Sequence, residues 1–205
     1  GIINNIGRRE YELAKQEKLF GDCKFHIIPS IRELKYLKKA LEGREEWILL
    51  SCCHIGNLRE NVDICHRAGK KVIINHELVG GLGADRMAFQ LLKNMYHIDG
   101  VMGTGNTKIG LISREKMKSI RRIVLSDSLS VEQALRSMED MDYDGIELRP
   151  AYYAVQYYNK FRAICNCSFV VGGFVNSEEI LEKVYQAGFS GTMTSCVELW
   201  NHPLG

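Results

Sequence analysis

From residue 24 onward, short apolar runs alternate with amphipathic segments, a pattern typical of parallel strands joined by helices. The runs are rich in Val, Ile and Leu and do not alternate with polar residues, as expected of strands buried on both faces. We predict eight strands, at Phe25–Ile28, Trp47–Ser51, Val72–Asn75, Gly100–Gly103, Arg122–Leu125, Gly145–Leu148, Phe169–Gly172 and Gly191–Thr194. Eight consecutive strand–helix units favour a TIM-type (β/α)8 barrel over an open doubly wound sheet.

Capping signals predict where the connecting helices begin. Ser30 with Glu33, and Ser130 with Gln133, have the spacing of capping boxes ahead of amphipathic runs. Further helix starts are expected at Asn57, Asp85 and Asn176, and a helix end at Gly188. A shorter, more polar helix is expected over Lys108–Lys118.

The chain has no linker-like stretch and only three prolines, so we predict one compact domain. Residues 23–205 would form the ligand-sensing barrel. Residues 1–22 would form a helical extension, with a charged helix over Arg8–Phe20 that ends at Gly21 and covers the amino-terminal mouth of the barrel.

Composition narrows the class of protein. A chain of 205 residues with 45% hydrophobic and 25% charged residues can bury its own core, and a net charge of +2 identifies no partner. The seven cysteines are odd in number and include no C-x-x-C pair, which favours reduced thiols over disulfides or zinc. With no signal peptide and no long apolar run, we expect a cytoplasmic protein that does not span a membrane.

In a (β/α) barrel the functional residues follow the strands, at the carboxyl-terminal face. Gly172 and Gly173 would let the backbone approach a ligand after the seventh strand. Thr194 and Ser195 would offer hydroxyl and N–H groups before a short helix after the eighth strand. Phosphate binding at this place is a recurrent use of the fold, and we predict it here; the alternative is that the glycines only form a tight strand exit.

Four other polar residues are expected on the same face. Glu77, Asp127 and Glu147 could accept hydrogen bonds from ligand hydroxyls, act as bases or hold a metal. The alternative is ordinary ion pairing, of Glu147 with Arg149 or of Asp127 with Arg122. His54 could donate a hydrogen bond or serve as an acid or base. With Thr104 and Ser30 as further rim residues, these four complete the predicted pocket, for which we expect neither metal nor cofactor.

The densest cationic stretch has six Lys and Arg residues between Lys108 and Arg122. If they shared a face, they could contact several RNA phosphates; a solvated helix face is the alternative. The candidate RNA-binding residues are Lys108, Arg114, Lys116, Lys118 and Arg121.

Seven segments together resemble the glycerol uptake operon antiterminator family, whose members are glycerol-3-phosphate-responsive regulators of bacterial glycerol genes. They are Ile28–Arg32, His54–Leu58, Glu77–Leu82 with Asp85, Arg122–Ser128, Ile146–Pro150, Val171–Phe174 and Thr194–Trp200. The resemblance implies a barrel that binds glycerol 3-phosphate and, with ligand bound, engages a leader mRNA so that transcription passes a terminator. It assigns the phosphate to Gly172, Gly173, Thr194 and Ser195, and the glycerol moiety or the pocket wall to Glu77, Asp127 and Glu147.

Three rim loops differ from the family's usual pattern. They are Asn75–Leu78 in place of His-x-Asp-Leu, Gly103–Gly105 in place of Ser-Thr-Arg/Lys, and Arg149–Ala151 in place of Leu-Pro-Gly. The ligand is therefore expected to be phosphorylated, either glycerol 3-phosphate or a related metabolite.

We expect a regulator of glycerol uptake and metabolism genes that is not an enzyme and whose partners are a leader mRNA and a small phosphorylated ligand. An isomerase, epimerase or aldolase acting on a phosphorylated metabolite is the alternative, and a barrel that binds a partner protein and senses nothing is a third. Whether the chain forms homo-oligomers is left open.

Overall fold

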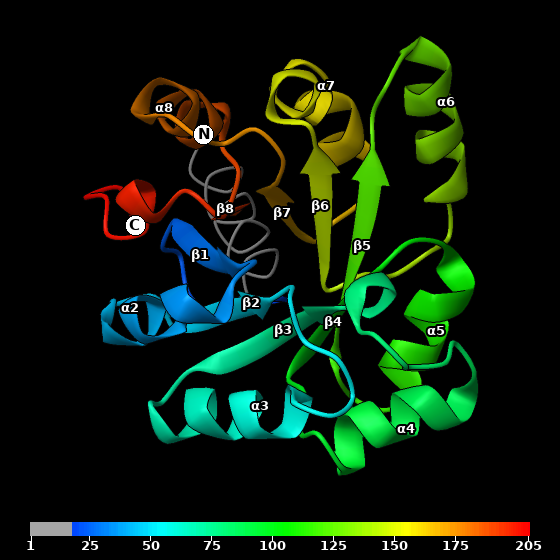
Figure 1. Ribbon diagram of the computed structural model, residues 1–205. Coiled ribbons are helices and arrows are strands. Elements are labelled where there is room, and N and C mark those ends of the chain that lie inside the picture. Colours follow the sequence, from blue (N-terminus) through cyan, green and yellow to red (C-terminus); the bar gives the residue numbers. More distant parts are fainter. Residues whose placement is uncertain (1–17) are drawn as a thin grey trace, which may run out of the picture.

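The computed structural model describes residues 18–205, which form a closed barrel of eight parallel strands in sequential order (Figure 1). The strands are β1 (His26–Ile31), β2 (Trp47–Leu50), β3 (Lys71–Asn75), β4 (Gly100–Gly103), β5 (Lys118–Val124), β6 (Gly145–Arg149), β7 (Ser168–Val171) and β8 (Gly191–Thr194). Pairing of β1 with β8 closes the sheet. The predicted (β/α)8 barrel is confirmed.

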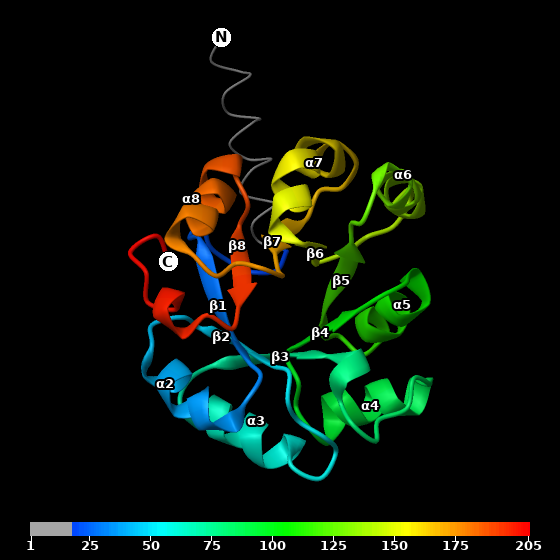
Figure 2. The same cartoon turned by 45° about the horizontal axis from the view of Figure 1, so that its top comes forward.

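Helices surround the strands on the outside, as Figure 2 shows. They are α2 (Leu37–Glu42), α3 (Leu58–Arg67), α4 (Arg86–Asn94), α5 (Asn106–Arg114), α6 (Ser128–Ser137), α7 (Ala151–Ile164) and α8 (Glu178–Ala187), with short 3-10 turns η1 (Leu34–Tyr36), η2 (His76–Leu78) and η3 (Val197–Leu199). Each helix returns the chain to the amino-terminal end, so every strand-to-helix loop lies on one face of the barrel.

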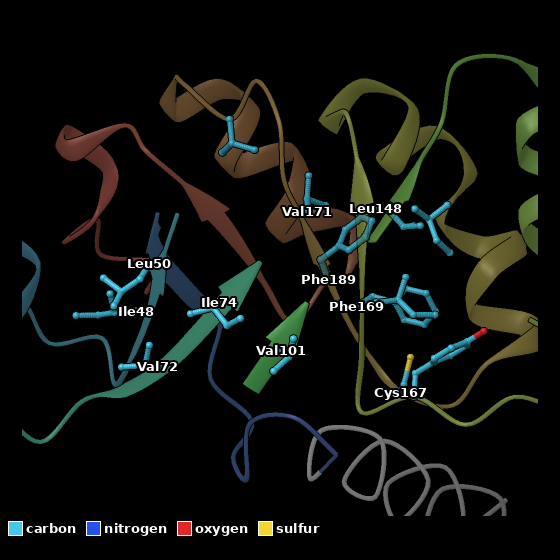
Figure 3. Close-up of a cluster of buried hydrophobic side chains, with 14 of the residues drawn as sticks. Ile48, Leu50, Val72, Ile74, Val101, Leu148, Cys167, Phe169, Val171 and Phe189 are labelled. Carbon is cyan, nitrogen blue, oxygen red and sulfur yellow. The ribbon is translucent and has the colours of Figure 1, made fainter. Parts of the chain in front are cut away.

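Alternate residues of each strand face the interior and the helices. In β2 and β3, Leu49 and Ile73 pack in an inner cluster, whereas Ile48, Leu50 and Ile74 belong to the outer cluster beneath the helices (Figure 3). Both layers are almost fully buried. This two-sided burial explains why the strands read as continuous apolar runs.

Residues before β1 close the amino-terminal mouth of the barrel. Leu19 and Phe20 are buried in the inner cluster, and the ring of Phe20 stacks on His26 with centroids 4.0 Å apart. Residues 18–24 form turns and bends. The predicted helix over Arg8–Phe20 otherwise lies outside the described residues.

Two predicted capping boxes are wrong. Ser30 lies inside β1, which runs on to Ile31, and α2 starts only at Leu37 after a 3-10 turn. On the far side of the barrel, the box before α6 is formed by Asp127 and Ser130: the carboxylate accepts from the Ser130 N–H, and the Ser130 hydroxyl oxygen accepts from the Asp127 N–H. The predicted box, Ser130 with Gln133, has the same spacing but begins three residues after the true cap, Asp127.

The other predicted helix boundaries lie closer to the observed ones. Asn57 and Asp85 are the residues before α3 and α4, as predicted, and Gly188 ends α8 with a positive φ of 96°. The cap of α8 is Ser177, one residue after the predicted Asn176. The expected helix over Lys108–Lys118 is instead α5, which ends at Arg114.

Candidate functional site

A cavity of about 890 Å³ opens at the carboxyl-terminal face of the barrel, over the ends of β1, β6, β7 and β8. Of the residues predicted from sequence, it is lined by Ser30, Glu147, Gly172, Gly173, Thr194 and Ser195. It is also lined by Arg32, Arg122, Arg149, Phe174 and Asn176, which the sequence analysis did not assign to a site.

The two glycines after β7 are required by close contacts. A Cβ atom on Gly172 would lie 2.6 Å from Glu147 Oε1, which no side chain could tolerate without displacing the carboxylate. Gly173 has a φ of +76°, and a Cβ there would meet Arg149 Nε at 3.2 Å. The N–H of Gly172 donates to the Leu148 carbonyl. The glycine pair therefore makes room for the charged groups of β6 beside it.

Glu147 is the central charged group of the cavity wall. Its side chain is fully buried, and Arg122 donates to its Oε2 through Nε (3.2 Å) and Nη2 (3.0 Å). Arg149 Nε lies 3.2 Å from the other oxygen, Oε1, as an ion pair. Oε1 has no hydrogen-bond donor among residues 18–205. A buried carboxylate oxygen with spare acceptor capacity can bind a donor from a ligand.

The expected pairing of Glu147 with Arg149 is present, but Arg122 pairs with Glu147 and not with Asp127. Arg122 and Glu147 are register partners on β5 and β6. The predicted fifth and sixth strands contained both residues, but the register that places them side by side cannot be read from the sequence.

The cavity carries an excess of positive charge. Its lining contains three guanidinium groups (Arg32, Arg122 and Arg149) and one carboxylate, which leaves a net charge of +2. Burial lowers the pKa of Arg149; the charge of Glu147 opposes that change, and the charges of Arg122 and Arg32 add to it. Mutual repulsion of these cations favours an anion between them.

The residues after β8 form the opposite wall. The Thr194 hydroxyl donates to the Val175 carbonyl and accepts from the Cys196 N–H, so it holds the loops after β7 and β8 together. Ser195 is exposed in the cavity wall, and η3 follows it, as the sequence predicted.

Four predicted rim residues lie outside this cavity and make local contacts: His54, Glu77, Thr104 and Asp127. Glu77 accepts from the hydroxyl of Thr104 and from Lys108, 3.1 Å away. Asp127 caps α6. The exposed His54 accepts from the Gly56 N–H through Nδ1. None of the four lines the cavity.

The cationic stretch does not form one face. Lys108 pairs with Glu77 on the carboxyl-terminal rim, whereas Lys118 begins β5 at the opposite end and donates to the carbonyl of Lys18. Arg121 is half-buried and donates to Tyr143 and Ser137. Arg114 ends α5, and Lys116 follows in a turn with a positive φ of 59°. The five predicted residues therefore do not all share one face, and RNA binding by any of them stays a prediction.

The described residues contain neither a metal-binding cluster nor a membrane-spanning helix. No cluster of three or more His, Cys, Asp or Glu side chains there has an arrangement that would hold a metal ion. Within residues 18–205, no helix has both the length and the apolar character needed to cross a membrane.

Fold and site together define the class: a small (β/α)8 barrel with an arginine-lined cavity after its last strands. The family model described as "Glycerol-3-phosphate responsive antiterminator" matches residues 27–200. The chain belongs to this family, as the sequence resemblance indicated.

Two solved structures and one further protein are similar to this chain over most of its length. The crystal structure of a glycerol uptake operon antiterminator regulatory protein from Listeria monocytogenes is similar with a TM-score of 0.80 and 26% identity, covering 86% of this chain and 95% of that one. An antiterminator-related protein from Thermotoga maritima has a TM-score of 0.76 at 22% identity, over 86% and 98% of the two chains, and supports the fold. An uncharacterized Escherichia coli protein, YgcP, is 22% identical over 177 residues, or 85% of this chain and 91% of its own length.

Proposed function

We propose that the barrel is a sensor whose arginine-lined cavity binds a small phosphorylated polyol, either glycerol 3-phosphate or a close relative. The observation that carries this proposal is the excess of guanidinium groups around a buried carboxylate, one oxygen of which has no hydrogen-bond donor among the described residues. Arginine is well suited to phosphate because its planar N–H groups match the oxygens in pairs.

Charge and hydrogen bonding fit such a ligand. The doubly charged form of a phosphate monoester would balance the net charge of +2 in the cavity wall. Glu147 Oε1 would accept from a ligand hydroxyl, which must find a partner once it leaves water. Gly173 and Ser195 flank the space that the phosphate would occupy.

The residue at the end of β6 is a reason to test more than one phosphorylated ligand. Arg149 stands where the family usually has leucine, so this cavity has one cation more than the resemblance implies. We therefore infer a phosphorylated ligand and take glycerol 3-phosphate as the first compound to test.

Ligand binding would regulate antitermination at a leader mRNA. A ligand shifts an equilibrium only by its different affinity for two states, so the RNA-binding state must bind the phosphate more tightly. The chain would act by binding, without turnover of the ligand, in the cytoplasm.

Isothermal titration calorimetry tests the sensor. Glycerol 3-phosphate should bind, and glycerol should not. Arg149→Gln should weaken binding about 10- to 100-fold, the usual loss for a hydrogen bond between charged groups. Arg136→Gln is the matched control, because Arg136 is an exposed residue of α6 that pairs with Glu132 and does not line the cavity. Equal binding by both variants would contradict the proposal, and chemical conversion of the ligand would favour an enzyme.

A leader-transcript binding assay tests the regulation. RNA affinity should rise on addition of glycerol 3-phosphate and fall steeply with salt. Equal affinity with and without saturating ligand would refute the ligand-dependent step.

A further inference from the structure

A second cavity adjoins the arginine-lined one. It has a volume of about 530 Å³ and lies at the ends of β1 and β8, two strands that pair with each other and lie side by side (Figure 2). Four residues line both cavities: Ser30, Arg32, Ser195 and Cys196. The open space therefore extends from the arginines past Arg32 towards the 3-10 turns η1 and η3.

This space is larger than glycerol 3-phosphate needs. Cavities of about 300–1,000 Å³ typically bury a drug-sized compound, and the arginine-lined cavity alone has a volume of about 890 Å³. Glycerol 3-phosphate is a much smaller molecule, so it would leave most of the space to water. A ligand that fills the site must extend well beyond the glycerol backbone.

Arg32 lies where the two cavities meet. Its side chain is exposed, and it forms no hydrogen bond or ion pair with another residue in the part of the chain that the structure describes. Its charge adds to burial and to the charge of Arg122 in lowering the pKa of Arg149. The N–H donors of Arg32 are therefore available to ligand oxygens at the passage between the cavities.

The second cavity has a lining of mixed charge. The residues that line it and not the first cavity are Glu33, Tyr36, Val197, Glu198 and Trp200. Glu33 is paired with Lys35, 2.8 Å away, which leaves the carboxylate of Glu198 to balance Arg32. Glu198 also accepts from the thiol of Cys196. Such a lining selects neither an anion nor a cation, but it offers donors and acceptors to neutral hydroxyl groups.

The aromatic side chains of this lining give little support to a flat or apolar group. Trp200 is buried, and its Nε1 donates to the Thr194 carbonyl. Lys35 Nζ lies 5.0 Å from the centre of the Tyr36 ring and covers one of its faces. A chain of hydroxyl-bearing carbons therefore fits the second cavity better than a nucleobase or an acyl chain does.

We propose that the two cavities form one extended site for a phosphorylated sugar alcohol or open-chain sugar that is longer than glycerol. The phosphate binds among the arginines of the first cavity, and a hydroxyl near it donates to Glu147 Oε1. Hydroxyls farther along the chain bind to Arg32 and to the polar groups of the second cavity. This inference rests on the proposed sensor function and names the class of ligand that the sensor binds.

Isothermal titration calorimetry on the full chain tests the extended site with three compounds: glycerol 3-phosphate, sorbitol 6-phosphate and sorbitol. Sorbitol 6-phosphate should bind roughly ten-fold or more tightly than glycerol 3-phosphate, because its additional hydroxyls form hydrogen bonds that the shorter ligand cannot reach. Sorbitol lacks the phosphate and should not bind.

Two variants remove polar groups that line only the second cavity. Glu198→Ala and Tyr36→Phe should each lower the preference for sorbitol 6-phosphate over glycerol 3-phosphate about 3- to 10-fold, the usual effect of one hydrogen bond. Tyr36→Phe keeps the ring, so its effect reports on the hydroxyl group. Glu132→Ala is the matched control, because Glu132 is an exposed carboxylate of α6 that lines neither cavity; it should leave the preference unchanged.

The ratio of the two affinities separates an extended site from a structural role. A variant that only disturbed the fold would weaken the binding of both phosphates alike and lower the Tm, and that result in both variants would overturn the proposal. A preference that stays unchanged in both variants would overturn it as well.

The three compounds also distinguish failure of the extended site from failure of the sensor. Binding of glycerol 3-phosphate, with sorbitol 6-phosphate binding no more tightly, would refute the extended site alone. A chain that binds neither phosphate would refute the proposed function and the extended site together, and so would sorbitol binding as tightly as its phosphate.

Discussion

The two halves of the carboxyl-terminal rim both contain carboxylates, but the surroundings of these carboxylates differ. On the half formed by the loops after β2 to β5, Glu77 and Asp127 are occupied by contacts with their own neighbourhood. On the half formed by β6 to β8, Glu147 is buried between two arginines, with one oxygen still lacking a donor and a cavity in front of it.

The comparison teaches that position after a barrel strand is not enough to make a binding residue. Glu77 and Asp127 follow strands, whereas Glu147 lies inside β6, and only Glu147 combines burial, an excess of nearby cations and open space. Local pairing can use up a rim residue completely, as the capping box does for Asp127.

The largest difference should appear when one cation is removed from each half. Arg122→Met should lower the free energy of unfolding by about 3–5 kcal/mol, because it leaves a buried carboxylate short of a partner. Lys108→Met removes the partner of the more exposed Glu77 and should cost at most about 1 kcal/mol. Urea unfolding measures both values, and similar losses would remove the distinction between the halves.

Glycine substitutions should give a smaller contrast. Gly172→Ala places a Cβ 2.6 Å from Glu147 Oε1 and should destabilise the fold by about 1–3 kcal/mol, the usual range for overpacking. Ligand affinity should fall with it. Gly110→Ala is the control in α5, where nothing lies within 4 Å of the new Cβ. It should raise the free energy of unfolding by roughly 0.5–1 kcal/mol, because alanine favours a helix more than glycine does. An unchanged midpoint for Gly172→Ala would show that Glu147 is free to move away.

The smallest effect concerns pH at Glu77. Partial burial raises its pKa, but hydrogen bonds from Thr104 and Lys108 outweigh burial and leave the pKa below its usual value. A depressed pKa stabilises the fold above the unfolded pKa of about 4.3, and this stabilisation is lost as pH falls through the lower folded value. Comparing wild type with Glu77→Gln in urea between neutral and acidic pH should show a small difference that disappears in acid. A difference that grows in acid would have the wrong sign.

Most of the fold could be predicted because burial on both faces makes each strand a continuous apolar run. The amino-terminal part of β5 was missed since Lys118 and Arg121 look like helix surface residues, while in the barrel Arg121 is half-buried against Tyr143. Strand ends depend on pairing with neighbours, which the chain does not reveal locally.

The site was predictable in part for a related reason. Gly172 and Gly173 stand out because only a close approach or a positive φ requires glycine there. Arg32, Arg122 and Arg149 come from different loops and strands, and only barrel closure and strand register bring their charges together. The excess of positive charge in the cavity carries the functional proposal. It could be recognised only from the structure, because the three arginines are far apart in the sequence.

A crystal structure of the chain grown with glycerol 3-phosphate tests the central claim most directly. We predict the phosphate between Gly173 and Ser195, within hydrogen-bond reach of Arg149, and a ligand hydroxyl on Glu147 Oε1. A phosphate bound instead beside Lys108 on the other half of the rim, or a cavity that stays empty at saturating ligand, would contradict the account.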